Sequence, residues 1–131
     1  MLKKQDRLVS QKDFKEAFGK GKGVKNAFLY FKTAPNQKGR IRFGFVVNKK
    51  ISGKAAVRNR IKRILRETVR QELAKNAYQE LGYDVVIVVL PEIAKILPSP
   101  VIARKIESQK IREEVILNLK LLEKNVFNKP V

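Results

Sequence analysis

The sequence predicts an α+β fold, a small two-layer α/β sandwich in which helices pack on one β-sheet. Three stretches carry this prediction: an aromatic and aliphatic run at 28–33, a β-branched run at 84–90, and helical apolar spacing between them. With 131 residues, 44% of them hydrophobic, the chain can bury one core. We therefore expect one domain over 1–131, with flexible ends at 1–6 and 126–131, and elements in the order α-β-β-α-β-α.

The first predicted helix begins near Ser10, because Asp13 lies three residues further on, as in a shortened capping box. Phe14 and Phe18 are four residues apart and share one face of this helix. The glycine–lysine run at 19–23 then predicts a mobile, basic loop, because glycine favours the end of a helix.

Three strands are predicted from the remaining apolar runs. The first covers 28–33 and the second 40–48, and the short turn at 35–39 between them favours an antiparallel hairpin. The third, at 84–90, is almost wholly apolar, which is typical of a central strand buried on both faces, and Pro91 ends it. Together with the helix before it, this strand predicts a β-α-β crossover.

The most informative stretch is the helix predicted within residues 49–70, where nine of 22 residues are Lys or Arg. Its apolar residues recur at the spacing of one helix face, and the basic residues occupy the rest. A solvated helix face normally mixes charge signs, whereas this one contains an unbroken i,i+4 row of like charges: Arg58, Lys62, Arg66 and Arg70. Such a row costs stability unless an anion neutralises it, so we expect a polyanion to bind here. A further helix is predicted at 107–123.

Composition excludes several classes of function. The chain has no His and no Cys, which excludes Ser-His-Asp catalysis, His-ligated zinc and thiolate metal sites. The carboxylates do not cluster, so we expect neither a catalytic residue nor a metal bound by the protein. No apolar run approaches the ~20 residues of a membrane span, and no secretory signal follows Met1, so a cytoplasmic protein is expected. The net charge of +18 favours a phosphate-rich partner.

The segment Arg58-Asn59-Arg60-Ile61-Lys62-Arg63 resembles the "RNR" signature of the bacterial ribonuclease P protein component. Further matches to the family follow in order along residues 1 to about 90: Arg7-Leu8, Asp13-Phe14, Phe18, Gly21-Lys22, Arg42-Phe43-Gly44, Lys49-Lys50 and Asp84-Val85-Val86-Ile87-Val88. The chain departs from the pattern at Leu90-Pro91, where many relatives have a basic residue, and in a longer loop at 51–53.

The resemblance implies the small subunit of a ribonucleoprotein endonuclease that removes the 5′ leader of precursor tRNA. It implies that the RNA subunit is the catalyst and holds the Mg²⁺ ions. It also implies a fold similar to the second domain of ribosomal protein S5, with a left-handed β-α-β crossover. The expected partners are therefore ribonuclease P RNA and precursor tRNA, with neither a membrane nor a small-molecule substrate.

The resemblance implies two groups of site residues. The basic helix would bind the RNA subunit through Arg58, Asn59, Arg60, Lys62, Arg63, Arg66 and Arg70. An aromatic cleft with a basic rim would hold the leader through Phe14, Phe18, Phe31, Lys22, Arg42, Lys49 and Lys50. The strand aromatic is either Tyr30 or Phe31, since neighbours point to opposite faces, and the family's aromatic-then-basic strand ending favours Phe31. Without the resemblance, the two helix phenylalanines are better explained as core, and each basic residue of the rim as ordinary surface.

Two other functions compete with this interpretation. One is a ribosomal RNA-binding or ribosome-assembly protein with no nuclease role, which would need no open aromatic cleft. The other is a stand-alone nuclease, which the lack of His and of clustered acids disfavours.

Overall fold

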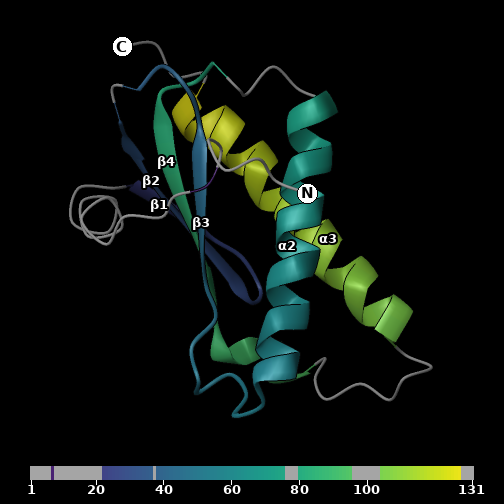
Figure 1. Cartoon of the computed structure of the whole chain (residues 1–131). Helices are drawn as coiled ribbons and strands as arrows, with labels where there is room; N and C mark the ends of the chain where they lie inside the picture. Colours follow the sequence, from purple (N-terminus) through teal and green to yellow (C-terminus); the bar gives the residue numbers. More distant parts are fainter. Residues whose placement is uncertain (1–6, 8–21, 37, 76–79, 96–103, 128–131) are drawn as a thin grey trace.

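The computed structural model describes residues 7, 22–36, 38–75, 80–95 and 104–127, which form one mixed sheet and two long helices (Figure 1). In chain order the elements are β1 (Lys22–Lys25), β2 (Leu29–Pro35), β3 (Arg42–Val46), α2 (Ala55–Lys75), β4 (Tyr83–Val89), the 3₁₀ helix η2 (Pro91–Lys95), α3 (Arg104–Leu122) and the π-helix η4 (Glu123–Phe127). The predicted α+β class is confirmed. The helix expected to begin near Ser10 lies outside the described residues.

The sheet has the strand order β1-β2-β4-β3. β2 runs antiparallel to both β1 and β4, whereas β3 runs parallel to β4. The predicted hairpin between 28–33 and 40–48 is therefore wrong, because β4 separates the two strands. The physical reason is burial: Val85, Val86 and Ile87 are fully buried, so β4 needs a strand on each side and cover on both faces. The prediction of a central strand here is confirmed.

The β-α-β crossover predicted through the basic helix is present, since α2 connects the neighbouring parallel strands β3 and β4. β1 was not predicted, because the glycine–lysine run at 19–23 indicated a loop. Val24 of β1 packs against the core opposite Phe31. Gly23 is needed for a different reason: a Cβ atom there would lie 2.5 Å from the Tyr30 hydroxyl oxygen and 2.7 Å from Cζ. The glycine therefore makes room for the Tyr30 ring, and the strand persists through it.

Both helices cover the same face of the sheet, which we call the near face (Figure 1). Alternate strand residues reach the core on this face, among them Leu29, Phe31, Phe43, Val85 and Ile87. α2 contributes the predicted stripe: Ile61, Ile64, Leu65 and Thr68 are buried, and Val57 is partly buried against the core. Val69, which was not predicted, is buried as well. The opposite face, called the far face here, carries Tyr30, Lys32, Ala34, Gly44, Val46, Val86 and Val88.

α3 begins three residues before the predicted helix and buries polar groups as well as apolar ones. Glu107 lies against α2, and Glu114 Oε2 accepts the backbone N–H of Phe28 at 3.1 Å, which ties α3 to the β1–β2 turn. Asn118 is fully buried, yet neither of its side-chain polar atoms has a hydrogen-bond partner among the described residues. After the helix, Val126 and Phe127, which belong to the end predicted to be flexible, pack against the core.

Candidate nucleic-acid interface

α2 begins after a turn that Ser52 helps to close. The Ser52 hydroxyl accepts the N–H of Lys54 at 3.2 Å, and the Lys54 carbonyl accepts the N–H groups of Val57 and Arg58 at 3.1 and 3.2 Å. Arg58 Nη1 in turn donates to the Ser52 carbonyl at 2.8 Å. One of the predicted RNA-binding residues therefore also holds the start of the helix.

The outward side of α2 forms a cationic ridge, which we define as Asn59, Lys62, Arg63, Arg66 and Arg70. Asn59 and Arg63 are exposed, and the other three are partly buried. A pocket of about 470 Å³ opens beside the ridge, lined by Ala56, Asn59, Arg60, Arg63, Arg66 and Glu67. Four of its six lining residues carry side-chain N–H donors, so the pocket suits an anionic or hydrogen-bond-accepting group.

Arg60 lies on the flank of α2 that faces α3, not on the ridge. Its Nε and Nη2 both donate to Glu107 Oε1, at 3.1 and 2.9 Å, and Nη2 also reaches Oε2 at 3.2 Å. The Arg60 side chain is 17% exposed and that of Glu107 is 1% exposed. Arg60, which the sequence predicted to bind RNA, therefore forms an ion pair with an acid 47 residues away in the chain.

Arg70 is engaged by an acid on its own helix. It donates to Glu67 Oε1 from Nε at 3.0 Å and also from Nη2. This hydrogen bond lowers the pKa of Glu67 below its ordinary value and raises the pKa of Arg70. Both side chains are more than one-third exposed, so solvent screens the pair. The pair weakens the like-charge row only at its C-terminal end.

Arg66 reaches from α2 toward the edge of the sheet. Its guanidinium carbon lies 5.9 Å from the centre of the Phe45 ring in β3, within the range of a cation–π contact. Its Nε is buried and has no hydrogen-bond partner within the described part of the chain. The ring orients the arginine without neutralising it, so its positive charge still adds to the ridge.

The choice of Phe31 as the strand aromatic of a substrate cleft is wrong in this structure. Phe31 is fully buried in the near-face core, where it pairs with Ile87 across β2 and β4. Tyr30, its neighbour, lies on the far face and is partly exposed. The phenol lies over Gly23 of β1. Of the two residues that the sequence left in competition, Tyr30 is therefore the one with a ring that a ligand can reach.

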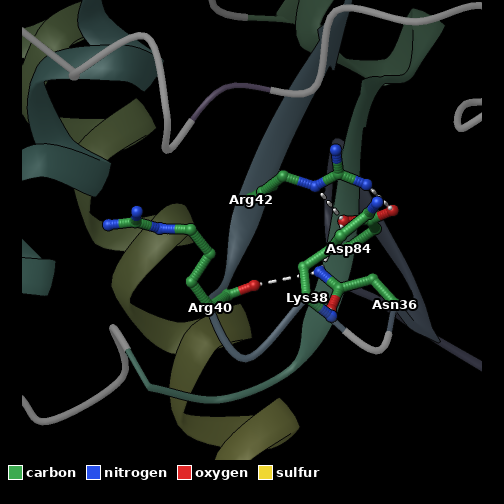
Figure 2. Close-up of polar contacts among 5 residues, drawn as sticks. All are labelled: Asn36, Lys38, Arg40, Arg42 and Asp84. Carbon is green, nitrogen blue, oxygen red and sulfur yellow. Dashed lines mark hydrogen bonds and ion pairs between the residues drawn. The ribbon is translucent and has the colours of Figure 1, made fainter.

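Arg42 lies on the far-face side of β3, but its charge is balanced within the protein (Figure 2). Its Nε and Nη2 donate to Asp84 Oδ1 and Oδ2, each at 2.8 Å. Asn36 Nδ2 donates to the same Oδ1 at 2.8 Å and to the Arg40 carbonyl at 2.9 Å, while its Oδ1 accepts the N–H of Lys38 at 2.8 Å. The cluster fastens the β2–β3 turn to the start of β4. Arg42 is therefore a structural residue first, and not a bare cation at the rim.

The remaining predicted contacts are only partly visible. Lys49 and Lys50 are exposed in the turn between β3 and α2, where Asn48 Oδ1 accepts the N–H of Lys50 at 3.0 Å. Phe14 and Phe18 lie outside the described residues, and so does the side chain of Lys22.

The described residues include no group of three or more acidic, His or Cys side chains that could hold a metal ion. Asp84 and Glu107, the buried acids beside the predicted site, both bind arginine. The donor set therefore does not fit Mg²⁺ bound by the protein alone. Nor is any helix in the described ranges both long enough and apolar enough to cross a membrane.

The missed features of the site are two acids that engage its arginines, Asp84 and Glu107. Asp84 carried a signal, because it is the one charged residue in the apolar run 84–90 and a buried charge needs a partner. Glu107 carried none, because nothing in sequence spacing brings α3 beside Arg60.

Three comparisons with known proteins agree. A family model described as Ribonuclease P matches residues 2–112. The Ribonuclease P protein component of Caldanaerobacter subterraneus subsp. tengcongensis is 40% identical over 95 residues, which are 72% of this chain and 78% of the relative. That of Syntrophomonas wolfei subsp. wolfei is 40% identical over 97 residues, or 72% of this chain and 76% of the relative.

Solved structures of two bacterial proteins resemble the fold. The RNase P protein from Staphylococcus aureus aligns with a TM-score of 0.72 at 26% identity, over 94% of this chain and 98% of that one. The RNase P protein from Thermotoga maritima aligns with a TM-score of 0.66 at 27% identity, over 86% of this chain and 93% of that one.

Proposed function

This chain belongs to the ribonuclease P protein family, and we propose that its cationic ridge binds the RNA subunit while its far face receives the precursor tRNA leader. As a ribonuclease P protein component, it is a subunit of an endoribonuclease of tRNA processing, and its partner in that complex is RNA. The alternative of a ribosomal or assembly protein is not favoured by these relatives.

The observation that carries the first half of the proposal is the exposure of Asn59 and Arg63, one helical turn apart on the ridge. Arg63 offers planar donors to phosphate, and Asn59 can hydrogen-bond a ribose 2′-hydroxyl. Lys62 and Arg66 add positive charge to the ridge. The Phe45 ring orients the guanidinium group of Arg66. Binding several phosphates would release counterions and relieve the like-charge repulsion along the helix.

The proposal that the far face receives the leader rests on Tyr30. Single-stranded RNA is commonly held by stacking of bases on aromatic rings in a basic surface. Tyr30 lies on the far face with Lys32, and its neighbour across the sheet is Lys25 of β1. Phe14 and Phe18 complete the proposed cleft as the resemblance implies, with Lys22, Lys49 and Lys50 at its rim. Arg42 contributes to the cleft by holding its floor together through Asp84.

We assign catalysis to the RNA subunit, which in this proposal also holds the Mg²⁺ ions that activate the attacking water. Asp84 and Glu107 are engaged by arginines, so in this proposal the protein's role is to neutralise phosphates and position the leader. Such a role lowers the magnesium requirement indirectly, because fewer cations are needed to fold and hold the RNA. A cytoplasmic location is part of the proposal, as the place where the precursor is made.

The finer fold assignment is also part of the proposal. The crossover β3–α2–β4 between adjacent parallel strands supports a topology like that of the second domain of ribosomal protein S5. The left-handed sense of that crossover is a proposal taken from the same resemblance.

Reconstitution tests the function. The full-length protein is mixed with a bacterial ribonuclease P RNA at low Mg²⁺, and removal of the 5′ leader from precursor tRNA is measured. We expect stimulation over the RNA alone, and a loss of it for Arg63→Glu, which reverses an exposed charge without disturbing the core. Equal cleavage with and without the wild-type protein across the whole magnesium range would contradict the proposal. Cleavage by the protein without RNA would instead support a stand-alone nuclease.

A further inference from the structure

The Arg-Asn-Arg segment at the start of α2 is not a uniform set of RNA contacts. Asn59 is exposed on the ridge, whereas Arg60 turns toward α3 and donates three hydrogen bonds to Glu107. Successive residues on a helix are about 100° apart, so the two side chains leave α2 in different directions. The neighbours in the sequence therefore meet different surroundings.

The two partners are buried to very different degrees. Glu107 is 1% exposed and both of its oxygens are engaged by Arg60. If Arg60 left to bind a phosphate, a negative charge would remain buried without its counter-ion, which is strongly unfavourable. A phosphate also carries the same sign as the carboxylate beside it. Arg60 is thus held in place whether or not RNA is bound.

Fixing Arg60 also fixes the rotation of α2 about its own axis. The guanidinium is clamped to α3 by a planar, two-nitrogen contact that tolerates little rotation. Asn59 precedes Arg60 by one residue and Arg63 follows by three, so their directions are set by the same clamp. Arg58, bonded to the Ser52 carbonyl, fixes the first turn in a similar manner.

We propose that Glu107 of α3 is a positioning residue for RNA binding: it takes up Arg60 so that Asn59 and Arg63 face the RNA. This inference rests on the proposed function and goes beyond it, because it removes the second arginine of the signature from the RNA-contacting set. It also gives α3 a part in RNA binding without any RNA contact of its own.

The direction in which RNA affinity changes when one negative charge is removed tests the inference. Glu107→Gln keeps the size of the side chain and removes one negative charge from a protein of net charge +18. If only total charge mattered, or if Arg60 were released to grip a phosphate, affinity for ribonuclease P RNA would rise. We expect it to fall by about threefold to tenfold, because the ridge loses its fixed orientation. The matched control is Glu113→Gln, the same substitution at an exposed position of α3, which should leave affinity equal or slightly higher.

A second pair of variants separates positioning from contact. Arg63→Met removes an exposed arginine, and we expect it to weaken binding and to lower the slope of log Kd against log salt by about 0.7–0.9, the value for one phosphate contact. Arg60→Met with Glu107→Met replaces the ion pair by two apolar side chains of similar length. We expect this double variant to fold and to lose affinity about as much as Glu107→Gln does, because the clamp is gone. We also expect it to keep the wild-type salt slope, since no phosphate contact is lost.

The outcomes divide clearly. An equal or tighter complex with Glu107→Gln, or a double Met variant whose salt slope falls as it does in Arg63→Met, would overturn the inference alone. If the double variant fails to fold in circular dichroism, the sign test with Glu107→Gln decides. A wild-type protein that does not bind ribonuclease P RNA would overturn the proposed function, and the inference with it.

Discussion

Tyr30 and Phe31 are adjacent in β2, yet they belong to opposite sides of the molecule. Phe31 is fully buried under the two helices, while Tyr30 lies on the far face over Gly23. The backbone alternation makes the two residues exclusive alternatives, and only the position of the helices decides between them. The near face is therefore expected to govern stability, and the far face to govern recognition of the leader.

The largest effect is expected from truncating the near-face residue. Phe31→Ala removes a fully buried ring from the core, so the free energy of unfolding should fall by about 3–5 kcal/mol. Urea denaturation followed by circular dichroism measures this loss. At a temperature where the variant is folded, precursor and mature tRNA should be affected alike. A selective loss of precursor binding would contradict the assignment of recognition to the far face, because it would give the buried ring a role in recognition.

Asp84 tests whether the far face is wholly a recognition surface. Asp84→Ala leaves Arg42 and Asn36 without their shared acceptor, so we expect a loss of about 3 kcal/mol of unfolding free energy, as for a broken, largely buried ion pair. The control is Asp84→Ala combined with Arg42→Met, which removes the uncompensated charge and should recover part of the loss. Thermal unfolding of the three proteins gives the comparison. No change in Asp84→Ala would mean that the cluster in Figure 2 holds nothing in solution.

Truncating the far-face residue should leave stability nearly intact and alter recognition. Tyr30→Ala is expected to weaken precursor tRNA binding to the reconstituted enzyme by about 1–3 kcal/mol, the contribution of stacking one base on an aromatic ring. Mature tRNA, which lacks the leader, should bind as before. Tyr30→Phe is the matched control and should retain most of the affinity. Equal losses for precursor and mature tRNA would remove Tyr30 from the proposed cleft.

Gly23 offers an indirect way to move the same ring. In Gly23→Ala the new Cβ atom would collide with the Tyr30 phenol, so the ring must shift. We expect a smaller loss of precursor affinity than in Tyr30→Ala. The double variant Gly23→Ala, Tyr30→Ala should bind no worse than Tyr30→Ala alone, because no ring is left to displace. Additive losses would show that Gly23 matters for another reason.

The smallest effect is expected beside the ridge, at Glu67. Its pKa is lowered in the folded protein by the hydrogen bond from Arg70, so the pair stabilises the fold above the ordinary carboxyl pKa of 4.5. That contribution is lost as pH falls through the lower, folded-state value. The melting-temperature difference between wild type and Glu67→Gln should therefore be small near neutral pH and should vanish in acid. RNA affinity should rise slightly in the variant, since a negative charge beside the ridge is removed.

Local pattern predicted much of this molecule. The apolar stripe of α2 and the central position of β4 follow from burial and periodicity, which are properties of short stretches. Strand pairing does not follow from short stretches. The short β2–β3 connection favoured a hairpin, but β4, a strand buried on both faces, lies between β2 and β3. Edge strand β1 was not predicted because glycine and lysine are poor strand formers. Gly23 is needed there because the Tyr30 ring lies over it, a contact that depends on the fold.

The basic residues show the same limit. Their number and spacing predicted an anion-binding helix, but not which of them the protein uses for itself. Arg42 and Arg60 are engaged by acids 42 and 47 residues away, and no periodicity links such positions. Arg63 is distinguished from Arg60 by its surroundings, and not by its residue type.

The place of β4 in the sheet has a consequence for how the protein is made. Among the described strands, β4 is the last to be synthesised and the one that both β2 and β3 pair with. Until it leaves the ribosome, β3 has no neighbour among the described strands and the apolar stripe of α2 has only part of a sheet to cover. Pairing between strands so far apart in the chain is slow to form. Folding is thus expected to wait for the final third of the chain and then to proceed in one cooperative step, with the near face as its nucleus.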